Sequence, residues 1–116
     1  MKKILIAAVS AMTLGFGFAS VQAEPGIIFD MGGKFDKSFN EAAFNGAERW
    51  KAENGGDYSE FEIKNPQQRE QAIRRLAQRG ANPVIGIGFA QADAIDIVSK
   101  EFPDTKFAII DMVVGN

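Results

Sequence analysis

Four short apolar segments alternate with segments of helical periodicity, and this alternation constrains the fold more than any other feature of the chain. The apolar segments are residues 26–30, 58–64, 83–88 and 106–111. Three are uncharged or nearly uncharged runs typical of buried strands, while residues 58–64 alternate between apolar and polar side chains. Strands separated by helices favour a parallel sheet with right-handed crossovers. We therefore expect an α/β fold, a Rossmann-like parallel sheet with the strand order 2-1-3-4.

The first helix is predicted to run from Ser38 to about residue 53. Ser38 and Glu41 have the spacing of a capping box, in which the serine caps the helix and the glutamate reaches back. Gly55 ends the helix, because glycine adopts the left-handed conformation at little cost. Small and apolar residues at helical spacing predict its inner face: Phe39, Ala43, Gly46, Ala47 and Trp50.

Two further helices are predicted over residues 67–79 and 91–102. Asn65 is the expected cap of the first of these, with Pro66 in its first turn and Gly80 after its end. The basic residues of this region are interpreted as a solvated face. They are Lys64, Arg69, Arg74, Arg75 and Arg79.

The first 23 residues have the pattern of a secretory signal peptide. Lys2 and Lys3 precede an apolar stretch, and small residues end at Ala23, where we predict cleavage. A membrane anchor is the alternative, but polar and glycine interruptions weaken it. We expect a soluble periplasmic protein in which residues 24–116 form the incomplete N-terminal lobe of a larger domain. The fourth strand would then be an edge whose following helix is missing.

The residue types that are missing exclude several chemistries. The chain has no cysteine and no histidine, and its formal net charge is −2 at pH 7. Disulfides, thiolate zinc sites, lipid attachment to cysteine and imidazole general bases are therefore excluded. The lack of a basic excess argues against nucleic-acid binding. Asp93 and Asp96 lack a second cluster of ligands, so we expect neither a metal nor another cofactor.

Ligands of open parallel sheets bind beyond the carboxyl ends of the strands, where the strand order reverses. Asp30, Gly88 and Asp111 follow the first, third and fourth predicted strands. A carboxylate at Asp111 can accept two hydroxyl hydrogen bonds of the kind that a ribose offers. The start of the first predicted helix opens on the same edge and favours polar or anionic groups.

Each of these positions also has a purely structural interpretation. Asp30 could accept hydrogen bonds from loop amides, and Phe39 could be a core aromatic rather than a ring that stacks on a flat ligand. Asn40 could satisfy the helix end or present its amide to a ligand. Gly86 and Gly88 could allow close helix packing.

Residues 28–41 resemble the opening signature of the basic membrane protein family, the substrate-binding proteins of ABC importers that include purine nucleoside receptors. The signature combines Asp30, two glycines and the run Asp36-Lys37-Ser38-Phe39-Asn40. Residues 84–89 and 107–111 resemble the third and fourth strands of the family. The similarity covers the whole chain after the signal segment.

The resemblance implies a type I periplasmic-binding fold, in which two lobes close on a nucleoside and present it to an ABC permease of the inner membrane. It implies no enzymatic activity. Phe39 would stack on the base, Asp30 and Asn40 would hydrogen-bond the nucleoside, Gly88 and Phe89 would shape the wall, and Asp111 would hold ribose hydroxyls. Asp36 and Lys37 would support the loop.

Other functions stay open at this stage. The same fold could bind a sugar, a flavin or a signalling molecule, because carboxylates at strand ends suit any polyhydroxyl ligand. An exported hydrolase that uses Asp30 and Asp111 is a third hypothesis, and it would need a raised carboxyl pKa or a metal. Met31 stands where the family commonly has a polar residue.

Overall fold

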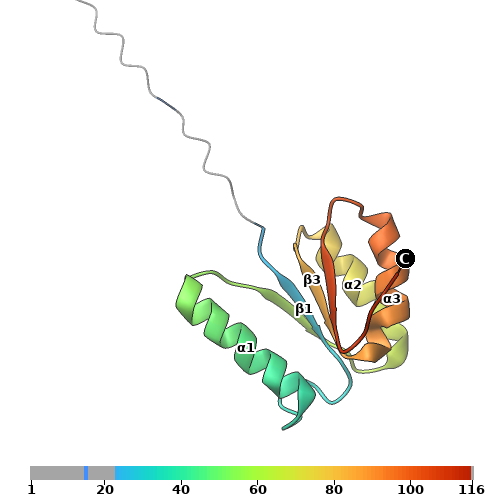
Figure 1. The fold of residues 1–116 in the computed structure, drawn as a ribbon, viewed down its shortest axis with the longest axis horizontal. Coiled ribbons are helices and arrows are strands. Elements are labelled where there is room, and N and C mark those ends of the chain that lie inside the picture. Colours follow the sequence, from blue (N-terminus) through green and yellow to red (C-terminus); the bar gives the residue numbers. More distant parts are fainter. Residues whose placement is uncertain (1–14, 16–22, 116) are drawn as a thin grey trace, which may run out of the picture.

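The computed structural model describes residue 15 and residues 23–115. The predicted signal peptide therefore lies outside the described residues, apart from Gly15 and Ala23. In chain order the elements are β1 (Gly26–Phe29), α1 (Phe39–Asn54), β2 (Ser59–Glu62), the 3-10 turn η1 (Pro66–Gln68), α2 (Arg69–Gln78), β3 (Val84–Ile87), the 3-10 turn η2 (Phe89–Gln91), α3 (Ala92–Glu101) and β4 (Phe107–Ile110) (Figure 1).

The four strands form one parallel sheet in the order β2-β1-β3-β4, which confirms the predicted fold class and strand order. Gly26 pairs with Ser59 on one side and with Val84 on the other. Each strand is four residues long, shorter than its apolar segment, because the outer residues of each segment belong to the flanking loops. The next strand in the chain after β1, β2, pairs with one side of β1, and β3 pairs with its other side. The strand order therefore reverses between β1 and β3.

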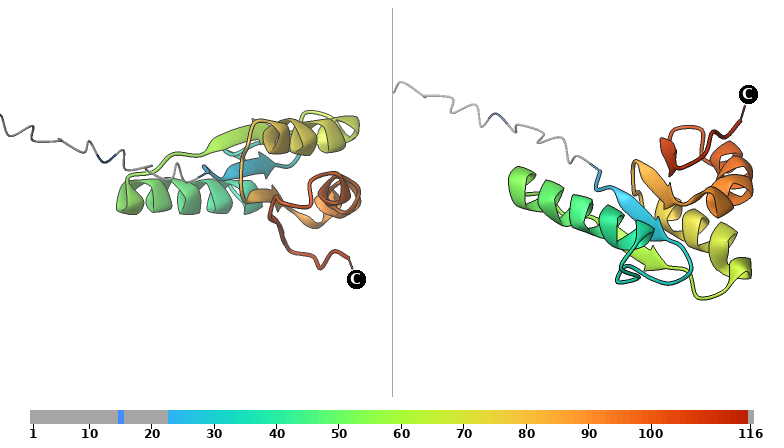
Figure 2. Two further views of the ribbon diagram at one scale, coloured as in Figure 1. Left: turned by 90° about the horizontal axis from the view of Figure 1, so that it is seen from above. Right: turned by 60° about the horizontal axis from the view of Figure 1, so that its bottom comes forward.

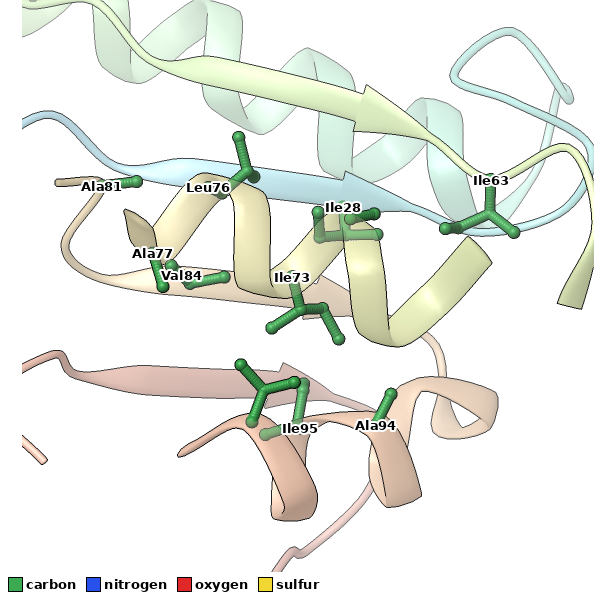
Figure 3. Close-up of a cluster of buried hydrophobic side chains, with 11 residues drawn as sticks. Ile28, Ile63, Ile73, Leu76, Ala77, Ala81, Val84, Ala94 and Ile95 are labelled. Carbon is green, nitrogen blue, oxygen red and sulfur yellow. The ribbon is translucent and has the colours of Figure 1, made fainter. Parts of the chain in front are cut away.

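One face of the sheet is covered by α2 and α3 (Figures 1 and 2). Ile28 of β1 and Val84 of β3 point to this face and pack against Ile73 of α2 and Ile95 of α3 (Figure 3). Gly86 lies beneath α3, since a Cβ built there would be 2.6 Å from the Ile95 side chain. This geometry supports the close-packing interpretation of Gly86.

The opposite face is covered by α1 (Figure 2). Ile27, Phe29 and Ile87 point to it, because side chains alternate along a strand. They pack against Ala43, Phe44 and Ala47. The predicted inner face of α1 is therefore partly wrong. Phe39, Gly46 and Trp50 are exposed, whereas Asn40 is buried. Asn40 takes an inward position that hydrophobic periodicity alone assigns to an apolar side chain, whereas Phe39 and Trp50 line an open groove beside β3 and β4.

The start of α1 also differs from the prediction. Ser38 is the N-cap residue, but its side chain makes no capping hydrogen bond. The carboxylate of Asp36 instead accepts the backbone N–H groups of the first turn, those of Ser38 (2.8 Å), Glu41 (3.1 Å) and Asn40 (3.2 Å). The two oxygens of the Asp36 carboxylate can accept three hydrogen bonds at once, whereas the single hydroxyl oxygen of Ser38 cannot.

A groove of about 940 Å³ lies between α1 and the part of this sheet face that the helix leaves uncovered. Phe39, Ala43 and Trp50 line it on the helix side, and Ile85, Ile87 and Ile110 line it from β3 and β4. None of the helices in the described part of the chain is long and apolar enough to cross a membrane.

Candidate functional site

The carboxyl ends of β1 and β3 meet at the point where the strand order reverses. Asp30 follows β1 and Gly88 follows β3. A Cβ built on Gly88 would be 3.5 Å from Oδ2 of Asp30, so the two residues are neighbours. The backbone N–H of Gly88 donates to the carbonyl of Ile110 (3.1 Å), which joins this point to the end of β4. The positions predicted from three separate strand ends therefore share one edge of the sheet.

The Asp30 carboxylate is held by an arginine that the sequence analysis assigned to a solvated face. Oδ1 of Asp30 accepts hydrogen bonds from Nη2 (2.8 Å) and Nε (3.3 Å) of Arg69. Both side chains are largely shielded from solvent, with 19% of Asp30 and 17% of Arg69 exposed. That interpretation of Arg69 was wrong because the first residue of α2 lies above the end of β1. Helical periodicity carries no signal of this contact.

The side chain of Asn40 clamps the main chain of the Asp30 loop. Its Oδ1 accepts the backbone N–H of Asp30 (3.0 Å), and its Nδ2 donates to the carbonyls of Asp30 (3.1 Å) and Met31 (3.3 Å). Only 3% of Asn40 is exposed. The sequence left two roles open for the Asn40 amide, a hydrogen bond to the helix end or a hydrogen bond to a ligand. The structure shows neither, because the amide binds the backbone of the loop.

The two aromatic candidates, Phe39 and Phe89, are both accessible to solvent. Phe39 begins α1, is 44% exposed and lines the groove together with Ile110. Phe89 begins η2 directly after Gly88 and is 65% exposed. A half-exposed ring that lines a groove can stack on a flat ligand, whereas a fully buried aromatic ring cannot. The core interpretation of Phe39 does not hold in this structure.

Asp111 follows β4 with a backbone φ of +77°. This is the left-handed region, which aspartate tolerates better than most side chains but which still costs free energy. Asp111 is exposed, next to the groove residue Ile110. The backbone turns sharply at Asp111, so β4 ends at Ile110 and the Asp111 carboxylate lies at the edge of the sheet.

Further contacts hold the loop between β1 and α1. Oε1 of Glu62 accepts the backbone N–H of Lys34 (3.0 Å), and a Cβ built on Gly33 would be 2.7 Å from the same oxygen. Gly33 has a φ of +74°, a conformation that favours glycine. Lys34 also pairs with Glu60, and its Nζ lies 5.1 Å from the centre of the Phe44 ring. The middle of the loop is thus held against β2.

Asp36 contributes to the electrostatics of this loop. Desolvation by itself would raise the pKa of its carboxyl, but three backbone N–H donors together lower the pKa below the ordinary value of 3.8.

Among the described residues, no group of three or more acidic side chains could hold a metal ion. The arrangement offers carboxylate oxygens, a ring and backbone groups, which suit hydrogen bonding and stacking with a small polar molecule.

Open parallel sheets with polar groups at the reversal point of the strand order are typical of ligand-binding α/β proteins. Comparison with known protein families identifies the family to which this chain belongs. The profile of the Bmp family, described as "ABC transporter substrate-binding protein PnrA-like", matches residues 24–116. The chain belongs to this family, as its resemblance to the basic membrane proteins indicated.

Curated relatives agree with this assignment. An uncharacterized lipoprotein of Pyrococcus furiosus is 35% identical over 97% of this chain and 30% of its own length. Basic membrane protein A1 of Borrelia garinii is 34% identical over 86% of this chain and 30% of its own length. The ABC transporter nucleoside-binding protein BmpA of Lactococcus lactis is 29% identical over 84% and 29%. The chain thus spans less than a third of the length of these relatives.

Solved structures show the same fold. An ABC transporter solute-binding protein from Aeropyrum pernix superposes with a TM-score of 0.75 at 25% identity, over 82% of this chain and 26% of that one. A second, from Conexibacter woesei, gives a TM-score of 0.64 at 37% identity, over 73% and 28%. The described part of the chain therefore has the architecture of part of a solute-binding protein.

Proposed function

We propose that this chain is part of the substrate-binding component of an ABC importer and that its carboxyl edge contacts a nucleoside. One observation carries the proposal: Asp30 and Gly88 adjoin at the reversal point of the sheet, with the accessible ring of Phe39 at the start of α1. The name of the Lactococcus lactis relative supports a nucleoside as the ligand. A permease and an extracytoplasmic location, in the periplasm after signal cleavage, complete the proposal.

The proposed contacts divide by chemistry. Phe39 stacks on the base, Oδ2 of Asp30 accepts a donor group, and Asp111 accepts ribose hydroxyls. Gly88 and Phe89 form the wall, and Asn40 acts by holding the Asp30 loop in place. A second part of the protein, closing over this edge, would supply the other half of the contacts.

Ligand-observed NMR on the full chain tests the ligand class, because it detects weak binding to one lobe. The panel contains adenosine, guanosine, inosine and cytidine, with riboflavin, ribose and galactose as the alternative classes. We expect nucleosides to bind and free sugars not to bind. Nucleosides that bind no better than ribose would contradict the proposal. Release of free base during the titration would favour the hydrolase hypothesis that uses Asp30 and Asp111.

Phe39→Ala tests the site within the same assay. Loss of stacking should weaken nucleoside binding by about 1–3 kcal/mol, if this ring behaves as stacking rings do elsewhere. Trp50→Ala is the matched control, because Trp50 is an exposed aromatic residue of the same helix but lies about three turns away from the helix start that carries Phe39. We expect the control to retain nucleoside affinity. Equal losses in the two variants would remove the assignment of Phe39.

A further inference from the structure

Asp30 is held from two directions. The side chain of Asn40, from α1 on one face of the sheet, binds the backbone N–H (3.0 Å) and the backbone carbonyl (3.1 Å) of Asp30. Arg69 binds its side chain from α2, on the other face. The end of β1 is therefore held from both helical layers, by α1 at the backbone of Asp30 and by α2 at its side chain.

Arg69 occupies only one of the two carboxylate oxygens. Its Nη2 and Nε both donate to Oδ1. Oδ2 lies on the side of Gly88, where a glycine with a φ of +98° leaves space that a side chain would narrow. A planar guanidinium can hold an oxygen with two donors in fixed geometry, which a lysine ammonium cannot do as well. The result is one acceptor atom with a fixed direction at the reversal point of the sheet.

The pair also changes the charge that a ligand meets. A carboxylate without a partner attracts cations, whereas a carboxylate paired with an arginine has its charge compensated locally. The remaining oxygen still accepts an O–H or N–H donor. A neutral donor-bearing molecule, such as a nucleoside, fits this arrangement better than an amine does.

We propose that Arg69 is a positioning residue for the ligand site, which fixes Asp30 so that Oδ2 accepts a neutral donor group. This inference rests on the proposed function for the identity of the ligand, but the arrangement of Asp30 itself can be tested without any ligand. Arg69 touches no ligand in this proposal. It acts only through Asp30.

The ligand-free test follows the side-chain carboxyl carbon of Asp30 by NMR in the full chain, with ¹³C-labelled aspartate. Arg69→Met should shift the Asp30 resonance clearly more than it shifts that of Asp104, an exposed aspartate in the turn before β4. Arg75→Met is the matched control, since Arg75 is exposed on the same helix and has no ion pair within the described residues. An unchanged Asp30 resonance in Arg69→Met would overturn the inference, whether or not a nucleoside binds.

The binding test is a double-mutant cycle with inosine as the probe. Arg69→Met should weaken inosine binding roughly 5-fold or more when Asp30 is present, and less than about 2-fold in the Asp30→Asn background. Arg69→Lys should weaken inosine binding less than Arg69→Met does, because lysine keeps the positive charge but lacks the two planar donors of the guanidinium. A loss that is the same in both backgrounds would show a general structural role and overturn the proposal. Wild-type protein that fails to bind any nucleoside would contradict the proposed function alone.

Discussion

The carboxylate of Asp36 receives three backbone N–H groups from the end of the loop and the first turn of α1. These N–H groups have no partner within the helix, and the helix dipole places partial positive charge beside them. An ionised carboxylate is therefore more stable in the folded chain than in the unfolded one. The same turn carries Phe39 and Asn40, so the cap also sets the position of two predicted site residues.

This capping contact predicts a dependence of stability on pH. The pKa of Asp36 is lowered on folding, so its contribution is complete above the ordinary value of 3.8 and is lost as the pH falls through the lower folded value. Asp36→Ala should lower the free energy of unfolding at pH 7, and the difference from wild type should shrink below that value. Urea unfolding at pH 7, 5 and 3 measures this. Asp104→Ala, an exposed control, should have little effect, and a constant difference for Asp36→Ala would refute the capping role.

At the scale of elements, two glycines in regular structure have opposite surroundings. Gly86 lies in β3 beneath α3, and a Cβ built there would meet Ile95 at 2.6 Å and Gln91 at 3.0 Å. Gly46 lies in the middle of α1, and a Cβ built there would point into open space. Packing requires glycine at the first position, whereas the second carries only the entropic cost of glycine in a helix.

The two positions should therefore respond to substitution in opposite directions. Gly86→Val should destabilise the chain by about 1–3 kcal/mol through overpacking of the core between β3 and α3. Gly46→Ala should stabilise it by about 0.5–1 kcal/mol, because alanine is the better helix former. Thermal unfolding of both variants provides the measurement. A stabilising Gly86→Val would show that α3 does not pack on β3 in this way.

Over the whole molecule, the two faces of the sheet are unequally covered. Among the elements of residues 23–115, α2 and α3 pack on one face, whereas α1 alone packs on the other and leaves the groove beside β3 and β4. On β4, Phe107 and Ile109 pack against the helical core, but Ala108 and Ile110 are exposed. An exposed edge strand next to an apolar groove favours association with another chain.

We therefore expect the chain to self-associate as its concentration rises, which sedimentation velocity measures. Ala108→Lys should reduce the association, because a charge on an edge strand opposes pairing. Ala52→Lys is the control, since Ala52 is exposed on α1 and does not line the groove. A chain that stays monomeric throughout, or an equal effect of both lysines, would contradict this expectation.

The α/β class, the strand order and the positions of Asp30, Gly88 and Asp111 after the ends of strands were predictable from the sequence. These depend on local signals, namely apolar runs, helix breakers and the right-handed crossover rule. The exposure of Phe39 and the hydrogen bonds from Arg69 to Asp30, a partner 39 residues away, follow instead from the tertiary packing. Contacts of this kind depend on how separate elements pack together, and neither hydrophobic periodicity nor residue spacing encodes which long side chain reaches across the end of a neighbouring strand.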